Sequence, residues 1–284
     1  MMPQWEPAAA LDLIARERIN IMGGILTHFI DLLQQSEMSP RDTQCLKSAW
    51  IGGAPVTPKI ARAVKDTLHF DALQAVYGMT ETMGVTTLSE FDAPIEVTCE
   101  NKGKPIGDYE IKVVNPETGE GRLVGEDGEI WVRGYLTMMG YYKNPEATRE
   151  AITPDGWFRT GDLGQFDSDG YLLITGRAKE MFFVGGSNAY PAEIERFLET
   201  HPDVGQAVVC GAPHERLGEV CFAFVMPRVG AKLTPEEVIA FCRGAIADYK
   251  VPRRLQVVED FPRTSTNKIQ RYLLKQEVTR LTTV

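Results

Sequence analysis

Several features that mark particular protein classes are missing from this 284-residue sequence. It has no run of lysine and arginine that could form a basic stripe, and its formal net charge is −9, so nucleic acid is not the expected partner. Its five cysteines are scattered without a CxxC pair, which indicates reduced, structural thiols. No signal peptide and no membrane-length apolar stretch is present. We therefore expect a cytoplasmic protein without a membrane span.

Two further absences concern ligands. No Walker A loop is present, so a phosphate-binding loop of that kind is excluded from this stretch of chain, and no internal repeat is visible. The sequence pI is about 5.1, so an anionic substrate would need a local positive site against an acidic background. Hydrophobic residues make up 43% of the chain, which is enough for packed cores.

Changes in hydrophobic pattern and residue composition along the chain predict three regions. Residues 1–98 alternate amphipathic helical patterns with short apolar strands, as in an α/β subdomain. Residues 99–178 contain β-rich runs separated by turn residues, which indicates a small antiparallel β-barrel. Residues 179–284 form a compact α+β pattern of domain size. The predicted fold class is therefore α/β plus α+β.

A hairpin pattern lies between Trp157 and Asn188. Asp169-Gly170 is typical of a two-residue turn, and folding the flanks about it places Asp162 opposite Arg177. The carboxylate can accept two ribose hydroxyls, and the guanidinium suits ribose or phosphate oxygens. An ordinary salt bridge closing the hairpin is the alternative.

Two turns after predicted strands carry further candidates. Gly52, Gly53 and Ala54 end one strand, where the absence of bulky side chains allows a flat ligand to approach, although a plain strand-to-helix turn would look the same. Tyr77 ends the next strand and is followed by G-M-T-E, with Thr80 beside Glu81. A hydroxyl and a carboxylate side by side can serve a phosphate and its Mg²⁺, or Thr80 can simply cap a helix.

Together W-F-R-T-G-D, Y-G-M-T-E, G-R-A-K-E and G-G-S-N-A-Y-P resemble the adenylate-forming superfamily, which includes acyl-CoA synthetases, luciferases and the adenylation domains of peptide synthetases. The resemblance runs along nearly the whole chain. It implies an acid–CoA ligase that activates a carboxylic acid with ATP and Mg²⁺ and transfers it to coenzyme A. The first helix–strand unit corresponds to the middle of the family's large domain.

The resemblance also implies roles for single residues. Thr80, Glu81 and Lys268 would be catalytic, with Thr80 at the adenylate phosphate, Glu81 holding the metal and Lys268 as the adenylation lysine. The nucleotide site, for ATP and AMP, would be formed by the residues already singled out at the turns and the hairpin: Gly52, Gly53, Ala54, Tyr77, Gly78, Asp162 and Arg177. Lys268 lies in T-N-K where the family usually has S-G-K, a departure that leaves a solvated surface lysine as the alternative.

Other family positions concern movement and the second substrate. Lys179 matches the hinge about which the carboxyl-terminal domain rotates, and Gly185-Gly186 matches a loop beside the pantetheine channel. Some relatives have a lysine four residues after the hinge, but this sequence has Phe183, so no cation is assigned there. Apolar walls of the acyl pocket would come from Ile25, His28, Met79 and Val85, although a lone histidine often only packs. The Tyr141-Tyr142 pair is expected to pack.

The family's Ser/Thr/Gly-rich phosphate loop is not found in this sequence. We therefore expect a truncated chain with little ligase activity by itself. No carrier domain follows the lysine loop, which favours free CoA as acceptor. The alternatives are an adenylation module that serves a carrier protein and a non-catalytic nucleotide-binding remnant. An aliphatic or alicyclic acid is expected as substrate, an aryl acid is not ruled out, and homo-oligomerisation stays open.

Overall fold

The computed structural model describes residues 5–52, 56–264 and 269–282. Within these ranges the chain forms two compact units, residues 1–174 and 175–284. The boundary falls inside the last strand of the first sheet. The finer predicted division at residue 98 stays a prediction.

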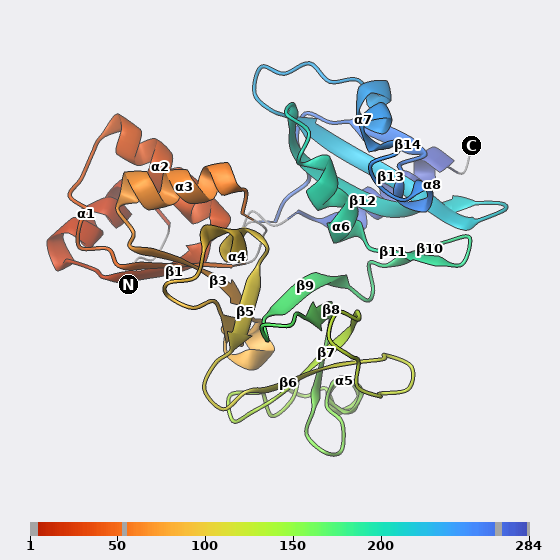
Figure 1. Cartoon of the computed structure of the whole chain (residues 1–284), viewed down its shortest axis with the longest axis horizontal. Helices are drawn as coiled ribbons and strands as arrows, with labels where there is room; N and C mark the ends of the chain where they lie inside the picture. The colour runs from red at the N-terminus through yellow and green to blue at the C-terminus, as the bar shows by residue number, and fades with distance from the viewer. Residues whose placement is uncertain (1–4, 53–55, 265–268, 283–284) are drawn as a thin grey trace. The chain divides into compact units, whose positions relative to one another are not determined.

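The first unit begins with alternating helices and strands (Figure 1). The elements are α1 (Pro7–Glu17), β1 (Ile21–Ile25), α2 (Leu26–Met38), β2 (Ser48–Gly52), α3 (Pro58–Leu68) and β3 (Ala72–Tyr77). β1, β2 and β3 are parallel neighbours, with Ser48 paired to both Ile21 and Ala72. Both α1 and α3 start with proline, which suits the first helical turn because it lacks an N–H group. Buried residues of the three helices pack with β2 and β3 into one core.

The remainder of the first unit is mostly antiparallel. Its elements are the 3₁₀-helix η1 (Thr80–Thr82), β4 (Thr87–Leu88), α4 (Ile95–Cys99), β5 (Lys102–Pro105), β6 (Glu110–Val114), β7 (Gly128–Arg133), α5 (Pro145–Ala151), β8 (Phe158–Phe166) and β9 (Leu172–Arg177). Within the described ranges, hydrogen bonds link the strands in the order β1-β2-β3-β4-β5-β9-β8-β7-β6. The predicted antiparallel region is therefore part of one nine-stranded sheet that continues from the parallel strands.

The turn between β8 and β9 is longer than the two residues predicted. The amide of Asp167 donates to the carbonyl of Tyr171 at 3.0 Å, which leaves three residues between this closing pair. The Asp167 carboxylate accepts from the amides of Asp169 and Tyr171 at 3.0 and 2.9 Å, so a side chain shapes the turn. The two-residue turn was wrong, and the facing pairs counted from it no longer follow.

The second unit is an α+β sandwich around a five-stranded sheet. Its elements are β10 (Phe182–Val184), β11 (Ser187–Ala189), α6 (Pro191–Leu198), β12 (Val204–His214), β13 (Gly218–Pro227), α7 (Pro235–Cys242), η2 (Asp248–Lys250), β14 (Arg254–Val257) and α8 (Arg271–Thr282). Alternate residues of β12 and β13 face two cores, one with α6 and α7 and the other with α8. α7 ends at Cys242, and Gly244 follows with φ +77°.

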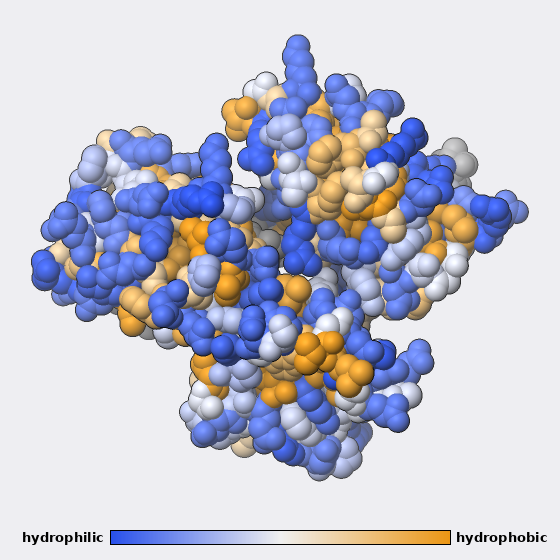
Figure 2. Space-filling view, viewed as in Figure 1, coloured by the Kyte–Doolittle hydropathy of each residue, from blue (hydrophilic) through white to orange (hydrophobic). Residues whose placement is uncertain are grey.

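The architecture confirms the predicted fold class, α/β followed by α+β. Hydrophilic side chains cover most of the visible surface of each unit, and apolar residues gather in limited patches (Figure 2). Among the described residues, no helix combines the length and apolar character that crossing a membrane requires.

Candidate active site

A tyrosine and an aspartate that the sequence singled out separately meet in the first unit. Tyr77 ends β3, and its hydroxyl donates to Oδ2 of Asp162 on β8 at 2.9 Å. Asp162 is only 5% exposed, and a buried carboxylate needs such donors. A carboxylate is an acceptor of hydrogen bonds only, so Asp162 has the chemistry that hydroxyl donors require.

The strand around Asp162 is held by contacts that the sequence reading missed. The amide of Asp162 donates to Oγ1 of Thr160 at 3.0 Å, and that hydroxyl donates to the carbonyl of Ile130 at 2.7 Å. Glu129 accepts from the amide of Gly161 at 3.2 Å. The contacts with Ile130 and Glu129 cross from β7 to β8, so nothing in the local pattern of T-G-D could have revealed them. They fix the backbone that presents the carboxylate.

The turn after β3 is built around Thr82. Its hydroxyl accepts from the amide of Met79 at 3.2 Å and from Oγ1 of Thr86 at 2.7 Å. Its carbonyl accepts from the hydroxyl of Tyr109 at 2.7 Å. The exposed side chain of Thr80 makes none of these contacts, so Thr82 rather than Thr80 organises the turn and Thr80 is left facing solvent.

Glu81 is approached by the segment that precedes α5. The amide of Met138 donates to the carbonyl of Glu81 at 2.8 Å, and the hydroxyl of Tyr141 donates to its Oε1 at 3.1 Å. Partial burial, together with this hydrogen bond and the negative charge of Glu81, raises the pKa of Tyr141. Sequence reasoning expected Tyr141 only to pack, because a partner sixty positions away leaves no local signal.

The donor set around Glu81 fits a magnesium ion that also binds substrate phosphates. Within the described part of the chain, no cluster of three or more His, Cys, Asp or Glu side chains could cage a metal. Mg²⁺ commonly uses one or two carboxylates and completes its shell with phosphates and water. Tyr141 is the one described residue that hydrogen-bonds to the Glu81 carboxylate, and it contacts Oε1. Oε2 can therefore face a cation.

Backbone packing accounts for two of the predicted glycines. A Cβ at Gly78 would lie 2.4 Å from the carbonyl oxygen of Gly84, and a Cβ at Gly52 would lie 2.9 Å from that of Val76. Both distances are too short for any other residue, whatever ligand binds nearby. Gly53 and Ala54 lie outside the described residues.

The predicted hinge lies in a short turn at the start of the second unit. Lys179 is exposed in the turn over residues 178–180, where the amide of Glu180 donates to the carbonyl of Arg177 at 3.1 Å. Arg177 and Asp162 belong to different units, so their predicted partnership at one nucleotide stays a prediction. Lys268 lies outside the described residues.

Gly185 and Gly186 form the tip of the hairpin between β10 and β11. Their φ angles are +59° and +90°, and Val184 pairs with Ser187 across them. Two consecutive left-handed residues define the tight hairpin turn that glycine permits. The preceding Phe183 is 52% exposed, and its amide donates to Glu219. The turn explains both glycines structurally, and the CoA contact stays a prediction.

A charged network that the sequence reading missed connects the start of the second unit to its last helix. Arg271, the first residue of α8, donates to Oε1 and Oε2 of the buried Glu195 at 2.8 and 2.5 Å. It also lies 3.6 Å from a carboxylate oxygen of Glu180. Burial alone would lower the pKa of Arg271, but these carboxylates raise it. Glu180 directly follows Lys179, so the network anchors the residue next to the predicted hinge.

The residues predicted for the acyl pocket are partly buried. His28 packs on the ring of Trp5, with centroids 4.2 Å apart, and Trp5 donates to Asp31 at 2.9 Å. Ile25 ends β1 beside α2. Met79 and Val85 flank η1. The packing of His28 matches the simpler alternative for that residue, and the acyl pocket stays a prediction.

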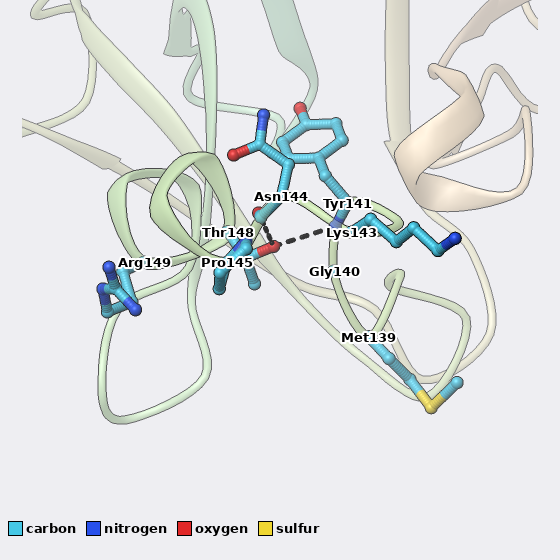
Figure 3. A pocket seen from close by; sticks show the side chains of 8 residues that line it. All are labelled: Met139, Gly140, Tyr141, Lys143, Asn144, Pro145, Thr148 and Arg149. Carbon is cyan, nitrogen blue, oxygen red and sulfur yellow. Dashed lines mark hydrogen bonds between the residues drawn. The ribbon is translucent and has the colours of Figure 1, made fainter.

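An open pocket of about 510 Å³ lies on the segment that carries Tyr141 (Figure 3). Its lining residues are Met139, Gly140, Tyr141, Lys143, Asn144, Pro145, Thr148 and Arg149. Thr148 ties the segment together, because its Oγ1 accepts from the amide of Tyr141 and donates to the carbonyl of Asn144, both at 2.9 Å. The ring of Tyr141 and the side chain of Met139 point away from one another.

Comparisons with known proteins show to which family the chain is similar. The family model for AMP-binding enzymes matches residues 1–142, and the model for the carboxyl-terminal domain of AMP-binding enzymes matches residues 193–268. The mitochondrial medium-chain acyl-CoA ligase of Bos taurus is 37% identical over 276 residues, which are 97% of this chain and 45% of that protein.

Two solved structures show the same similarity. The amide bond synthetase McbA from Marinactinospora thermotolerans is 31% identical with a TM-score of 0.87, over 98% of this chain and 57% of that one. The O-succinylbenzoate CoA synthetase of Bacillus subtilis, in complex with ATP and magnesium, is 29% identical with a TM-score of 0.82, over 96% of this chain and 55% of that one. The chain thus spans about half the length of the relatives it matches.

Proposed function

Because the chain belongs to the AMP-binding enzyme family, we propose that the complete protein joins a carboxylic acid to coenzyme A at the expense of ATP. The observation that carries this proposal is the hydrogen bond between Tyr77 and Asp162. Shortly after Tyr77 in the sequence comes Glu81, whose carboxylate has one oxygen held by a hydrogen bond from Tyr141. The 37% identity to a medium-chain acyl-CoA ligase supports CoA as the acceptor.

The reaction has two steps with different demands. In the first, a carboxylate oxygen of the acid attacks the α-phosphorus of ATP, the bond to the β-phosphate oxygen breaks, and pyrophosphate leaves. In the second, the sulfur of CoA attacks the acyl carbon, the bond to the AMP oxygen breaks, and the thiol proton passes to solvent. The first step brings an anionic acid to a triphosphate, so positive charge is needed at the reacting centre.

In the first unit, Asp162 accepts the ribose hydroxyls while the hydroxyl of Tyr77 donates to its Oδ2. Thr80 meets the α-phosphate, and Glu81 holds Mg²⁺, which screens the phosphates when bound. Holding the ribose in one place fixes the α-phosphorus for in-line attack. Met79, Val85, Ile25 and His28 contribute to the wall against which the acyl chain lies.

In the second unit, Lys268 supplies the cation for adenylation, and Arg177 contacts ribose or phosphate oxygens. Rotation about Lys179 then removes Lys268 and brings Gly185-Gly186 beside the pantetheine of CoA. Rotation of a domain about one or two residues is an ordinary mechanism for such an exchange. Phe183 offers an apolar side chain where some relatives have a lysine.

The 284-residue chain by itself is expected to turn over slowly. It spans about half of each relative, and its sequence contains no Ser/Thr/Gly-rich phosphate loop, so the triphosphate would be held incompletely. The test compares the chain with a chimera in which the amino-terminal part of the Bos taurus ligase precedes it. Formation of AMP that depends on both acid and CoA is measured for each, and the amino-terminal part alone is the control.

We expect acid-dependent AMP formation by the chimera, little by the chain, and a loss of at least about 100-fold in the chimera with Asp162→Ala. The matched control is an Asp169→Ala chimera, which loses a carboxylate at the exposed turn between β8 and β9. The difference between the two variants gives the effect of the position of Asp162. Equal activity of the two variants would refute the role of Asp162. An inactive chimera whose folded chain also fails to bind AMP would refute the function as a whole.

The acceptor and the acid need separate assays. An amide bond synthetase is among the similar structures, so an amine is the second candidate acceptor and a carrier-protein thiol the third. In parallel reactions with CoA, a carrier protein or an aliphatic amine as acceptor, we expect product only in the reaction that contains CoA. AMP release measured with a panel of aliphatic, alicyclic and aryl acids identifies the acid that the enzyme activates.

Two further expectations are tested on the protein itself. Fractionation of cells tests whether the protein is cytoplasmic, and sedimentation of the purified protein tests whether it self-associates.

A further inference from the structure

The segment before α5 reaches across the first unit to the turn that carries Glu81. Two contacts join them: the amide of Met138 to the carbonyl of Glu81 at 2.8 Å, and the hydroxyl of Tyr141 to Glu81 Oε1 at 3.1 Å. The backbone contact fixes the position of the glutamate main chain, and the side-chain contact fixes the position of its carboxylate. One residue is therefore held at both its main chain and its carboxylate.

Tyr141 is itself anchored. Its amide donates to Oγ1 of Thr148 at 2.9 Å, and that hydroxyl donates to the carbonyl of Asn144 at 2.9 Å, as Figure 3 shows. Thr148 belongs to α5, and the side chain of Asn144 caps the same helix by accepting from Ala147 at 3.1 Å. Gly140 allows the close approach, because a Cβ there would lie 2.7 Å from Thr148. The tyrosine hydroxyl is thus delivered from a helix end rather than from a free loop.

We propose that Tyr141 is a positioning residue for the Glu81 carboxylate, holding Oε1 by a hydrogen bond so that Oε2 is presented to a divalent cation. The proposal rests on the proposed function, because Glu81 is there the metal ligand. Tyr141 does not touch the reacting atoms. It acts through Glu81, as hydrogen-bonding groups behind metal ligands generally do when they select one orientation of the ligand.

A neutral donor suits this role better than a cation would. A phenol leaves the negative charge of the carboxylate in place, whereas a lysine or arginine would balance it before a metal arrived. A free glutamate side chain also samples several rotamers, and the hydrogen bond removes part of that freedom before the metal binds. Losing the bond should therefore weaken metal binding without abolishing it.

The adjacent tyrosine provides a matched control. Tyr142 is 88% exposed, against 39% for Tyr141. Tyr142→Phe removes the same atom one position away without touching Glu81. The chain is titrated with Mn²⁺ in the presence of ATP, and free Mn²⁺ is counted by electron paramagnetic resonance for wild type, Tyr141→Phe, Tyr142→Phe and Glu81→Gln.

We expect Glu81→Gln to lose the ATP-dependent Mn²⁺ site and Tyr141→Phe to weaken it about 10-fold, the lower end of the effect of such supporting groups. Tyr142→Phe should bind as wild type does. If Glu81→Gln loses the site and Tyr141→Phe binds as wild type, the positioning role is refuted while the proposed function stands. If no Glu81-dependent Mn²⁺ site exists in the wild-type chain or in the chimera that supplies the amino-terminal part, the metal role of Glu81 fails, and the proposal for Tyr141 fails with it.

A second readout separates positioning from simple support of the turn. Hydrogen exchange of residues 79–84 and the melting temperature are compared between Tyr141→Phe and Tyr142→Phe. A positioning role predicts unchanged exchange, because Met138, Tyr109 and Thr82 hold the turn by other bonds. Faster exchange of the turn together with a lower melting temperature in Tyr141→Phe would show a structural role and overturn the proposal.

Discussion

Asp162 and Glu81 of the first unit and the buried Glu195 of the second unit are held in different ways. In the first unit, Asp162 and Glu81 accept hydrogen bonds from the tyrosine hydroxyls of Tyr77 and Tyr141. In the second unit, Arg271 bonds both oxygens of Glu195, and the amide of Val209 adds a contact at 2.7 Å. The Glu195 oxygens are therefore occupied and their charge is balanced, whereas the phenol at Glu81 leaves the charge available.

This difference separates carboxylates that suit a ligand from those that build a fold. A carboxylate that a guanidinium grips at both oxygens has little left to offer a substrate, and it stabilises packing only while its partner is present. A carboxylate held by a neutral hydroxyl keeps acceptor positions and charge. Three perturbations test the comparison.

The largest effect is expected from Arg271→Met. It leaves the buried Glu195 without its cation, and an uncompensated buried charge costs about 3–5 kcal/mol. The free energy of opening, measured by hydrogen exchange of β12 and β13, should fall by roughly that amount. The matched variant is Arg280→Met on the same helix, where the pair with Glu277 is exposed and contributes at most about 1 kcal/mol. Equal effects of the two variants would contradict the structural role of the network.

The next effect is a pH dependence at Glu199, a carboxylate of the second unit without an arginine bonded to it. Its Oε1 accepts from the amide of Ala207 at 3.1 Å, and burial raises its pKa to about 7. A raised carboxyl pKa favours the folded state at low pH, and that advantage is lost as the pH rises from about 4.5 through 7. Wild type should therefore lose about 2 kcal/mol of stability relative to Glu199→Gln between about pH 5 and pH 8.

Unfolding of the second unit at several pH values, again by hydrogen exchange, measures this difference. The exposed Glu236, exchanged for Gln, serves as the comparison because it lies on the same unit without burial. A constant difference between wild type and Glu199→Gln across this range would show that the Glu199 carboxyl is solvated like Glu236.

The smallest effect is expected from Tyr77→Phe. It removes one donor from the buried Asp162, and a hydrogen bond to a charged group contributes about 1.5 kcal/mol or somewhat more. Urea unfolding followed by tryptophan fluorescence reports on the first unit, because all four tryptophans lie there. Tyr135→Phe, at a residue 72% exposed, should change little. No difference between the two variants would mean that Tyr77 is dispensable for holding Asp162.

Local patterns predicted most of the elements and missed most of the contacts. The helices at Pro7–Glu17 and Pro58–Leu68 follow from apolar spacing and an initial proline, which act within a few residues. The turn between β8 and β9 was mispredicted, because the side chain of Asp167 competes with the Asp169-Gly170 signal for the same backbone amides.

The candidate site shows the same limit. Motif resemblance selected Tyr77, Asp162 and Glu81 one by one, but the bond between the first two joins positions 85 apart. Glu129 and Tyr141 lie in segments whose own patterns are those of an ordinary strand and loop. Such partners are found only when the fold places β7 beside β8 and the segment before α5 beside η1.

The amino-acid order alone determined most of the helices and strands and the family to which the chain belongs, because each of these is read from neighbours along the chain. Tertiary structure alone decided which carboxylate meets a phenol and which meets a guanidinium. That choice sets whether charge is balanced or left for a ligand, and it depends on strand pairing between residues that are remote in sequence.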